Sequence, residues 1–219
     1  MSTLRTLSKF QSKLQGGGAR LNLFEVSIPE LPDAAKNSSP KATWGSEEQE
    51  DFTIMCKGAQ LPASTIASID VPFRGRILKV AGDRTIENWT VTVINDENFN
   101  IRNAMEAWMN AIARLSNNTG AVNPGSYMCD AYVYQLGRGY SSGRFSKANS
   151  GTDDGESITP LKSFKFLDIF PVSVSSIDLS YDSSDTIEEF TVEFAVQSFE
   201  SIGSGSGDGE SDQTGVNLN

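Results

Sequence analysis

Few residues in this chain have the types and spacing that chemistry requires. The 219-residue sequence contains no histidine and only two cysteines, Cys56 and Cys129, without a CxxC pair. Histidine-based acid–base catalysis and Cys/His metal sites are therefore excluded. Both cysteines lie in strand-like runs, so we expect buried free thiols in a reducing compartment.

One glycine-rich segment, residues 137–145 with the sequence GRGYSSGRF, combines cations with aromatic rings, which can hold phosphates or stack on bases. The segment lacks the Gly-Lys-Ser/Thr ending of a phosphate-binding loop. We therefore favour a subunit-contact or solvent loop here, with nucleotide binding as the alternative.

The acidic residues form no catalytic or metal-binding pattern. Residues 153–156 and 208–212 are acidic clusters, but neither has the alternating acids and glycine placement of an EF-hand. Glu188 and Glu189 are adjacent, so on a strand they point to opposite faces and are poor candidates for a glycosidase carboxylate pair. A serine nucleophile elbow is absent as well. The sequence predicts no enzyme, no cofactor and no metal ion.

Charge divides the chain into a basic arm and an acidic body. Residues 1–20 carry four cations and no acid, so the formal charge of −10 leaves −14 on the rest of the chain. An acidic body argues against gripping nucleic acid over the whole surface. There is no run of about 18 apolar residues, so we expect no membrane-spanning segment.

The most regular stretch runs from Lys79 to Trp108. Trp89, Val91 and Val93 alternate with polar or outward-facing residues, which predicts a strand with one face in a core. Asn95 and Asp96 then end the strand and can cap a helix. The helix is predicted by an apolar stripe at spacings of three and four, formed by Ile101, Met105, Trp108, Ile112 and Leu115. We expect Trp89 to pack against this helix.

The remaining elements are mostly β. Alternation predicts strands at residues 23–28, 52–61, 127–136, 161–168, 176–181 and 187–199. We expect one domain, residues 21–200, that forms an antiparallel β-sandwich or barrel with one flanking α-helix. Polar insertions at about 29–51 and 137–159 are predicted to be exposed loops. The basic arm 1–20 and a Gly/Ser-rich acidic tail, 201–219, flank the domain.

A long hairpin is predicted from Thr65 to Val80, with the reversal at Arg74-Gly75-Arg76. The residues expected to make the contact between subunits are Ile69, Val71, Phe73, Leu78 and Val80. Because the hairpin has more strand than the core of such a domain needs, we expect it to pair between subunits. The segment Gly82-Asp83-Arg84-Thr85 that follows is predicted to be a loop, with Asp83 and Arg84 close enough to pair or brace it.

Two ordered blocks of this sequence resemble the tail tube protein family of contractile-tailed (myovirus-type) bacteriophages. The first contains Val80-Ala81-Gly82-Asp83-Arg84-Thr85, Trp89-Thr90-Val91-Thr92-Val93 and Asn95-Asp96-Glu97; the second contains Phe170-Pro171, Leu179, Tyr181-Asp182-Ser183 and Ile187-Glu188-Glu189-Phe190-Thr191-Val192. The family signature, which is structural, falls on Gly82, Asp83, Arg84, Thr85, Trp89, Asn95 and Asp96.

The resemblance implies a structural, non-enzymatic subunit of the virion, assembled in the host cytoplasm. It implies hexameric rings whose strands join across subunits into one continuous barrel, stacked into an inner tube. The tube would cross the host envelope on sheath contraction and conduct the viral genome. The implied partners are further copies of the chain, the tail sheath, the baseplate hub or initiator, the tape measure and the tail terminator. DNA would pass through the lumen transiently, without specific binding.

Two alternatives remain open. The first is the inner tube of a related contractile injection or secretion system, of the tailocin or type VI kind, which delivers protein. The second is a carbohydrate-binding or hydrolytic β-sandwich, for which Trp44 in the polar loop is the candidate aromatic platform. If the chain forms a DNA conduit, its acidic excess predicts a net negative bore, with Arg74, Arg76 and Lys79 paired with acids or turned away.

Overall fold

The computed structural model describes residues 7–14, 18–37, 42–137, 160–182 and 185–202. Most strands belong to one seven-stranded antiparallel sheet with the order β1-β6-β7-β8-β5-β2, and β9 pairs with β7 on the edge opposite to β6. These strands are β1 (Phe24–Ser27), β2 (Cys56–Ala59), β5 (Trp89–Ile94), β6 (Cys129–Gln135), β7 (Lys162–Val174), β8 (Glu189–Ala195) and β9 (Ser198–Ile202). The mainly β architecture is as predicted.

The long strand β7 bends and so belongs to two halves of the sheet. Residues 162–169 pair with β6, and residues 163–167 also pair with β9, whereas residues 170–174 pair with β8. At the bend, Asp168 has a φ of 52°, in the left-handed region that aspartate tolerates better than most residues. Its backbone N–H donates to Asp130 Oδ1 at 3.3 Å. The bend lets the two halves face each other as a sandwich.

Aromatic rings fill the space between the two halves. Trp89 of β5 stacks on Phe166 of β7, with ring centroids 4.6 Å apart, and lies 5.4 Å from Phe194 of β8. The ring of Trp108, from the helix, lies 5.9 Å from Phe194. Trp89 thus belongs to the same core cluster as the helix residues, and Phe194 contacts the rings of both Trp89 and Trp108.

Helix α4 (Asn100–Ile112) covers one side of this core, as predicted, and buries Ile101, Met105 and Trp108. Its start lies four residues beyond Asp96, whose Oδ2 accepts from the Asn100 N–H at 3.4 Å. The predicted stripe is wrong at Leu115, which lies beyond the helix and is 93% exposed. Asn117 accepts hydrogen bonds from the Thr119 backbone N–H and hydroxyl, a local arrangement that competes with helix continuation.

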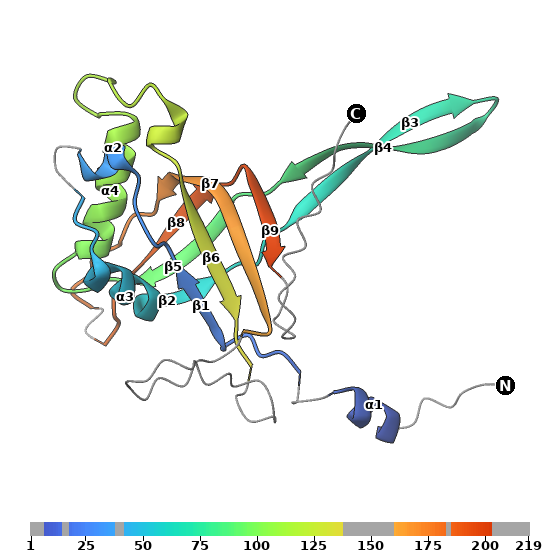
Figure 1. Ribbon diagram of the computed structural model, residues 1–219, viewed down its shortest axis with the longest axis horizontal. Helices are drawn as coiled ribbons and strands as arrows, with labels where there is room; N and C mark the ends of the chain where they lie inside the picture. Colours follow the sequence, from blue (N-terminus) through green and yellow to red (C-terminus); the bar gives the residue numbers. More distant parts are fainter. Residues whose placement is uncertain (1–6, 15–17, 38–41, 138–159, 183–184, 203–219) are drawn as a thin grey trace, which may run out of the picture.

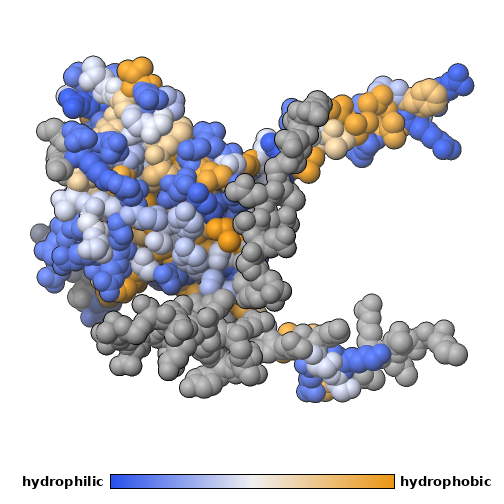
Figure 2. Space-filling view, in the orientation of Figure 1, coloured by the Kyte–Doolittle hydropathy of each residue, from blue (hydrophilic) through white to orange (hydrophobic). Residues whose placement is uncertain are grey.

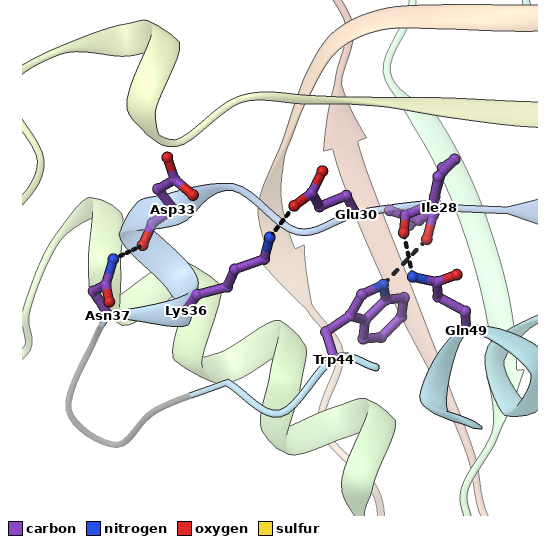
Figure 3. Close-up of polar contacts among 8 residues, drawn as sticks. Ile28, Glu30, Asp33, Lys36, Asn37, Trp44 and Gln49 are labelled. Atoms are coloured by element: carbon purple, nitrogen blue, oxygen red, sulfur yellow. Dashed lines mark hydrogen bonds and ion pairs between the residues drawn. The ribbon is translucent and has the colours of Figure 1, made fainter. Parts of the chain in front are cut away.

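The prediction that residues 29–51 are an exposed inserted loop is wrong. This segment contains α2 (Asp33–Lys36) and the start of α3 (Ser46–Met55), and it buries Leu31, Ala35 and Ala42 in the core. Lys36 forms an ion pair with Glu30 (Figure 3). The apolar residues were missed because their irregular spacing has neither a helical nor a strand period.

Helix α3 also corrects the predicted strand at residues 52–61. Residues 52–55 are its last turn, and only Cys56–Ala59 form a strand. The helix starts where the Glu48 carboxylate accepts from the Gly45 N–H at 2.7 Å, with Glu47 and Glu48 in the first turn, where the helix dipole favours acids. These start signals outweigh the two-residue alternation that follows.

Two other predictions about strands need correction. Residues 176–181 do not form a strand; they lie in an irregular connection, where Ser180 Oγ accepts from the Asp182 N–H at 3.3 Å. The predicted strand 187–199 is divided into β8 and β9, because the chain passes from one half of the sheet to the other between them. Strand β9 extends to Ile202, one residue beyond the predicted start of the tail.

The smaller elements are α1 (Leu7–Lys13), within the predicted basic arm, and the 3-10 turn η2 (Pro124–Ser126). The predicted insertion 137–159, apart from Gly137, and the tail beyond Ile202 lie outside the described residues. Strands β3 (Ser64–Phe73) and β4 (Arg76–Ile86) form a separate two-stranded sheet that projects far from the body (Figure 1).

Candidate assembly surface

The projecting hairpin reverses where the sequence predicts. Arg74 and Gly75, the two residues between β3 and β4, have φ values of 44° and 81°. Positive φ at both loop positions is the mark of a type I′ turn, whose twist matches that of the flanking strands. The register is regular from the turn to the pair Ser68–Ala81, so the outer part of the hairpin is a well-defined two-stranded ladder.

One face of this ladder is apolar and open. Val71 pairs with Leu78 and Ile69 with Val80, and Phe73 continues the same face beside the turn. We call this set the apolar hairpin face; its five members, Ile69, Val71, Phe73, Leu78 and Val80, are between 42% and 66% exposed. Figure 2 shows apolar residues along the projecting strands. An isolated two-stranded hairpin is marginal in water, and a contiguous apolar patch marks an interaction surface.

The opposite face of the ladder is more polar. Lys79 Nζ lies 2.9 Å from Asp70 Oδ1, and these two residues are direct cross-strand partners. Pro72 pairs with Ile77 on the same side. The guanidinium of Arg74 lies 5.5 Å from the centre of the Phe73 ring. The two faces therefore differ in hydropathy between residues 69 and 80, although Arg76 lies opposite Phe73 on the apolar face and Ile77 lies on the other.

The predicted loop at residues 82–85 is wrong, because all four residues lie within β4. Ile66 pairs with Arg84 and Ser68 with Ala81, so β4 has one extra residue at this point and forms a β-bulge. A Cβ at Gly82 would lie 3.1 Å from the Ala67 carbonyl oxygen, so the close strand approach explains the glycine. Arg84 donates to Ser64 Oγ at 3.2 Å and forms no ion pair with Asp83 in the described structure.

The other signature residues lie in the body. The Trp89 indole N–H donates to the Gln60 carbonyl oxygen at 2.9 Å, and the ring is buried. Asn95 binds Glu188 through both its backbone N–H and its side chain, at 2.9 and 3.0 Å. Asp96 supports the start of α4. The signature residues therefore lie in three places: the bulged base of the hairpin, the core, and the β5–α4 connection.

Sequence reasoning missed an apolar groove between α4 and β7. It has a volume of about 650 Å³, and its lining includes Met109 and Ile112 of the helix together with Phe170, Val172 and Val174 of the strand. The two walls are distant in the sequence, so no local period could reveal the groove. Phe170 belongs to the second block of the family resemblance, but its spacing from other apolar residues did not indicate that it lines a groove.

Residues with catalytic potential are held in structural roles. The Lys57 ammonium pairs with Glu189, whereas Glu188 binds Asn95, so the two adjacent carboxylates diverge as expected. Burial raises the pKa of the Cys56 thiol from 9.0 to about 12 and raises that of Cys129 further. Within the described ranges no three His, Cys, Asp or Glu side chains are placed to hold a metal ion, and no helix is long and apolar enough to cross a membrane.

Trp44 is not an exposed platform. Its indole N–H donates to the Ile28 carbonyl oxygen at 3.1 Å (Figure 3), and its ring centroid lies 5.7 Å from that of Phe52. These contacts attach the 42–45 segment to the body. The predicted clusters at 138–145, 153–156 and 208–212 lie outside the described residues.

Comparison with known proteins agrees with this architecture. A chain of the sheath/tube terminator of PVC, an extracellular contractile injection system, superposes with a TM-score of 0.51 at 12% identity, covering 84% of this chain and 96% of that chain. A chain of the baseplate of the anti-feeding prophage gives a TM-score of 0.51 at 12% identity, covering 85% and 96%. These likenesses show a shared fold.

Sequence relatives identify the family. The tail tube protein gp19 of Enterobacteria phage T4 is 31% identical over 185 residues, which cover 84% of this chain and 93% of that protein. The tail tube protein of Serratia phage KSP90 is 23% identical over 190 residues, covering 86% and 92%. The family model described as phage tail tube protein matches residues 19–201, which contain α4, the hairpin and the strands of the body up to the next-to-last residue of β9. The chain therefore belongs to the phage tail tube protein family.

Proposed function

We propose that copies of this chain close into hexameric rings that stack into the inner tube of a contractile phage tail. On this proposal the strands of neighbouring subunits join into one continuous barrel around a lumen. The observation that carries it is the β3–β4 hairpin: among the residues that the structure describes, its strands pair only with each other, and its apolar face is open. A contiguous apolar surface of this kind marks a site that binds a partner.

Free strand edges support the same assembly. Strands β1 and β2 end the pairing order of the sheet and β9 pairs only with β7, so among the described strands each of the three has one edge without a strand partner. A ring removes such edges, because every subunit supplies the partner that the next one lacks. The hairpin and the edges together give one subunit more than one contact with its copies.

The remaining partners follow from the place of a tube in a contractile tail. We propose that the rings lie inside a tail sheath and that the tube meets a baseplate hub or initiator, a tape measure protein and a tail terminator. The mature protein would be part of the virion after assembly in the host cytoplasm. The chain would act as a structural protein, and the genome would pass through the lumen without specific binding.

The charge of the body suits a DNA conduit. The outward side of the β5–β8 pair carries a threonine ladder, with Thr92 and Thr191 hydroxyls 3.5 Å apart, and Glu193, which accepts from Asn88 at 2.8 Å. A wall with fixed cations would hold phosphates and slow the exit of DNA. A net negative bore requires the cations of the hairpin to be neutralised or to point away from the DNA. Lys79 is neutralised by its ion pair with Asp70.

The inner tube of a contractile injection system is the second candidate, because the fold is shared with the PVC and anti-feeding prophage chains. The two candidates differ in what the tube is attached to. Purified native particles decide between them: a DNA-filled capsid on the tail indicates a phage, and a capsid-free particle that carries protein indicates an injection system.

The assembly is tested by shortening the hairpin. Residues 70–79 are replaced by Asn-Gly, which joins the paired residues Ile69 and Val80 through a two-residue turn. Because the hairpin pairs only with itself, the body should keep its circular dichroism and thermal midpoint. We expect negative-stain microscopy to show rings or tubes for the full chain and monomers for the shortened one. Tubes formed by the shortened chain would refute the role of the hairpin.

A further inference from the structure

The groove between α4 and β7 has an apolar lining that the described part of the chain leaves uncovered. Its walls are formed by Met109 and Ile112 on one side and by Phe170, Val172 and Val174 on the other. Leu115 at its end is 93% exposed, and Val172 is 47% exposed. Apolar surface of this kind, in a concave site of about 650 Å³, is the usual receptor for an apolar anchor.

Charge does not select the occupant of the groove. Arg102 and Glu106 line one part of it, but Arg102 Nε lies 2.8 Å from Glu106 Oε1. The same guanidinium donates to the Ser175 carbonyl oxygen at 3.2 Å and lies over the Phe190 ring. The cation is therefore already satisfied, so the groove favours a neutral apolar group over an anion.

A matching group exists on the same molecule, at its other end. Phe73 is 66% exposed and lies next to the type I′ turn, with the Arg74 guanidinium over its ring. The hairpin and α4 lie at opposite ends of the long axis (Figure 1). Because the hairpin and α4 of one copy are separated along this axis, a contact between them joins two copies.

We propose that the groove between α4 and β7 receives the hairpin tip of a second copy, with Phe73 as the anchor. This contact rests on the proposed self-assembly and specifies the surface that accepts the hairpin. An aromatic side chain buries about 150–250 Å² and supplies the type of anchor that dominates interfaces. The cross-strand pairs behind Phe73 hold it in place before docking, so little conformational entropy is lost on binding.

The placement of the two surfaces determines the symmetry of the contact. The tip and the groove are different patches, so each copy donates a tip to one neighbour and accepts a tip from another. Such a heterologous contact continues from copy to copy and produces a ring or a stack, whereas a contact between identical patches would stop at a dimer.

Helix α1 of a neighbour is the competing occupant, since Leu7, Phe10 and Leu14 are all exposed. The hairpin is favoured because α1 has seven residues, and a helix of that length is marginal alone. It would have to be ordered on binding, at a cost that the preformed hairpin avoids.

Cysteine cross-linking of the full chain tests the contact. Arg76, which pairs with Phe73 across the ladder, is replaced by Cys, and Asn110, a polar residue of the groove lining, is replaced by Cys in the same chain. Both choices keep Phe73 and the apolar lining intact. Matched controls combine Arg76→Cys with Val122→Cys, which is 96% exposed and outside the groove lining, and Gln11→Cys with Asn110→Cys for the α1 alternative. Assemblies are formed under reducing conditions, oxidised, and separated on a denaturing gel.

The expected result is a ladder of linked species beyond the dimer for Arg76→Cys/Asn110→Cys, at least tenfold more abundant than for the Val122 control. In addition, Phe73→Ala should raise the protein concentration needed for assembly at least tenfold. Rings or tubes without the ladder, or with the ladder only for the Gln11 pair, would overturn this contact and leave the proposed tube function intact. A chain that stays monomeric in reduced form, with no mutation, would overturn both.

Discussion

Replacing Val71 and Leu78 by threonine tests whether the apolar hairpin face drives assembly. The two residues are direct partners across the ladder, 42% and 62% exposed, so an interface can still bury about half of each side chain. Full burial of such a side chain is worth about 1.5–3 kcal/mol, so the pair contributes about 2 kcal/mol to a contact that covers it. Threonine keeps the β-propensity of the strand but lowers this gain.

A loss of about 2 kcal/mol corresponds to a roughly 30-fold higher concentration for half-maximal assembly, measured by sedimentation velocity. Ile77 provides a matched control, because it neighbours Leu78 on β4 and is 65% exposed but faces the polar side. The free energies of unfolding of Val71→Thr/Leu78→Thr and of the control Ile77→Thr should both lie within about 0.5 kcal/mol of that of the unmodified chain, since the changed residues are exposed. Equal effects of Leu78→Thr and Ile77→Thr on assembly would refute the distinction between the two faces.

Three further outcomes follow from individual contacts. Gly82→Val should reduce assembly, because the added Cβ would lie 3.1 Å from the Ala67 carbonyl oxygen. The thermal midpoint of the body should not change, because among the described strands those of the hairpin pair only with each other. A variant that forms tubes as readily as the parent would show that the bulge is not needed. Trp108→Phe removes the donor that lies 2.7 Å from the Tyr127 carbonyl oxygen and should lower the free energy of unfolding by about 1–3 kcal/mol in urea titrations, with no change contradicting that bond. Burial raises the pKa of Cys56 from 9.0 to about 12, so the native state keeps a proton that the unfolded chain loses; the free energy of unfolding should fall as pH rises from 9 to 12, by at most about 1.4 kcal/mol per pH unit, and Cys56→Ala should make this fall less steep.

Elements with a strong local period could be predicted from the sequence. The alternation at Trp89, Val91 and Val93 and the stripe at Ile101, Met105 and Trp108 each correspond to buried side chains in the structure. The turn at Arg74-Gly75 was predictable as well, because glycine supplies one of the two positive φ values that the turn needs. In each case the signal lies within a few residues.

Features that depend on distant residues could not be predicted. Gly82 reads as a turn because glycine commonly ends a strand, but its reason is the Ala67 carbonyl on the facing strand. Leu31 and Ala35 look isolated in a polar segment, although tertiary packing buries both of them. The groove has the same origin, since its two walls, within residues 102–115 and 170–174, are distant in the sequence.

The separation between the self-paired hairpin and the long-range sheet also has a consequence for the order of folding. β3 and β4 can pair as soon as residue 86 has left the ribosome, because all their partners are local. β5 must wait for β8, as the pair Thr92–Thr191 joins residues 99 apart, and pairing of this kind is slow. The apolar hairpin face can therefore form before the body of the subunit. A nascent chain exposes this face during synthesis, before its α4–β7 groove has formed. A partly synthesised chain therefore has the hairpin that binds another copy but lacks the groove that accepts one.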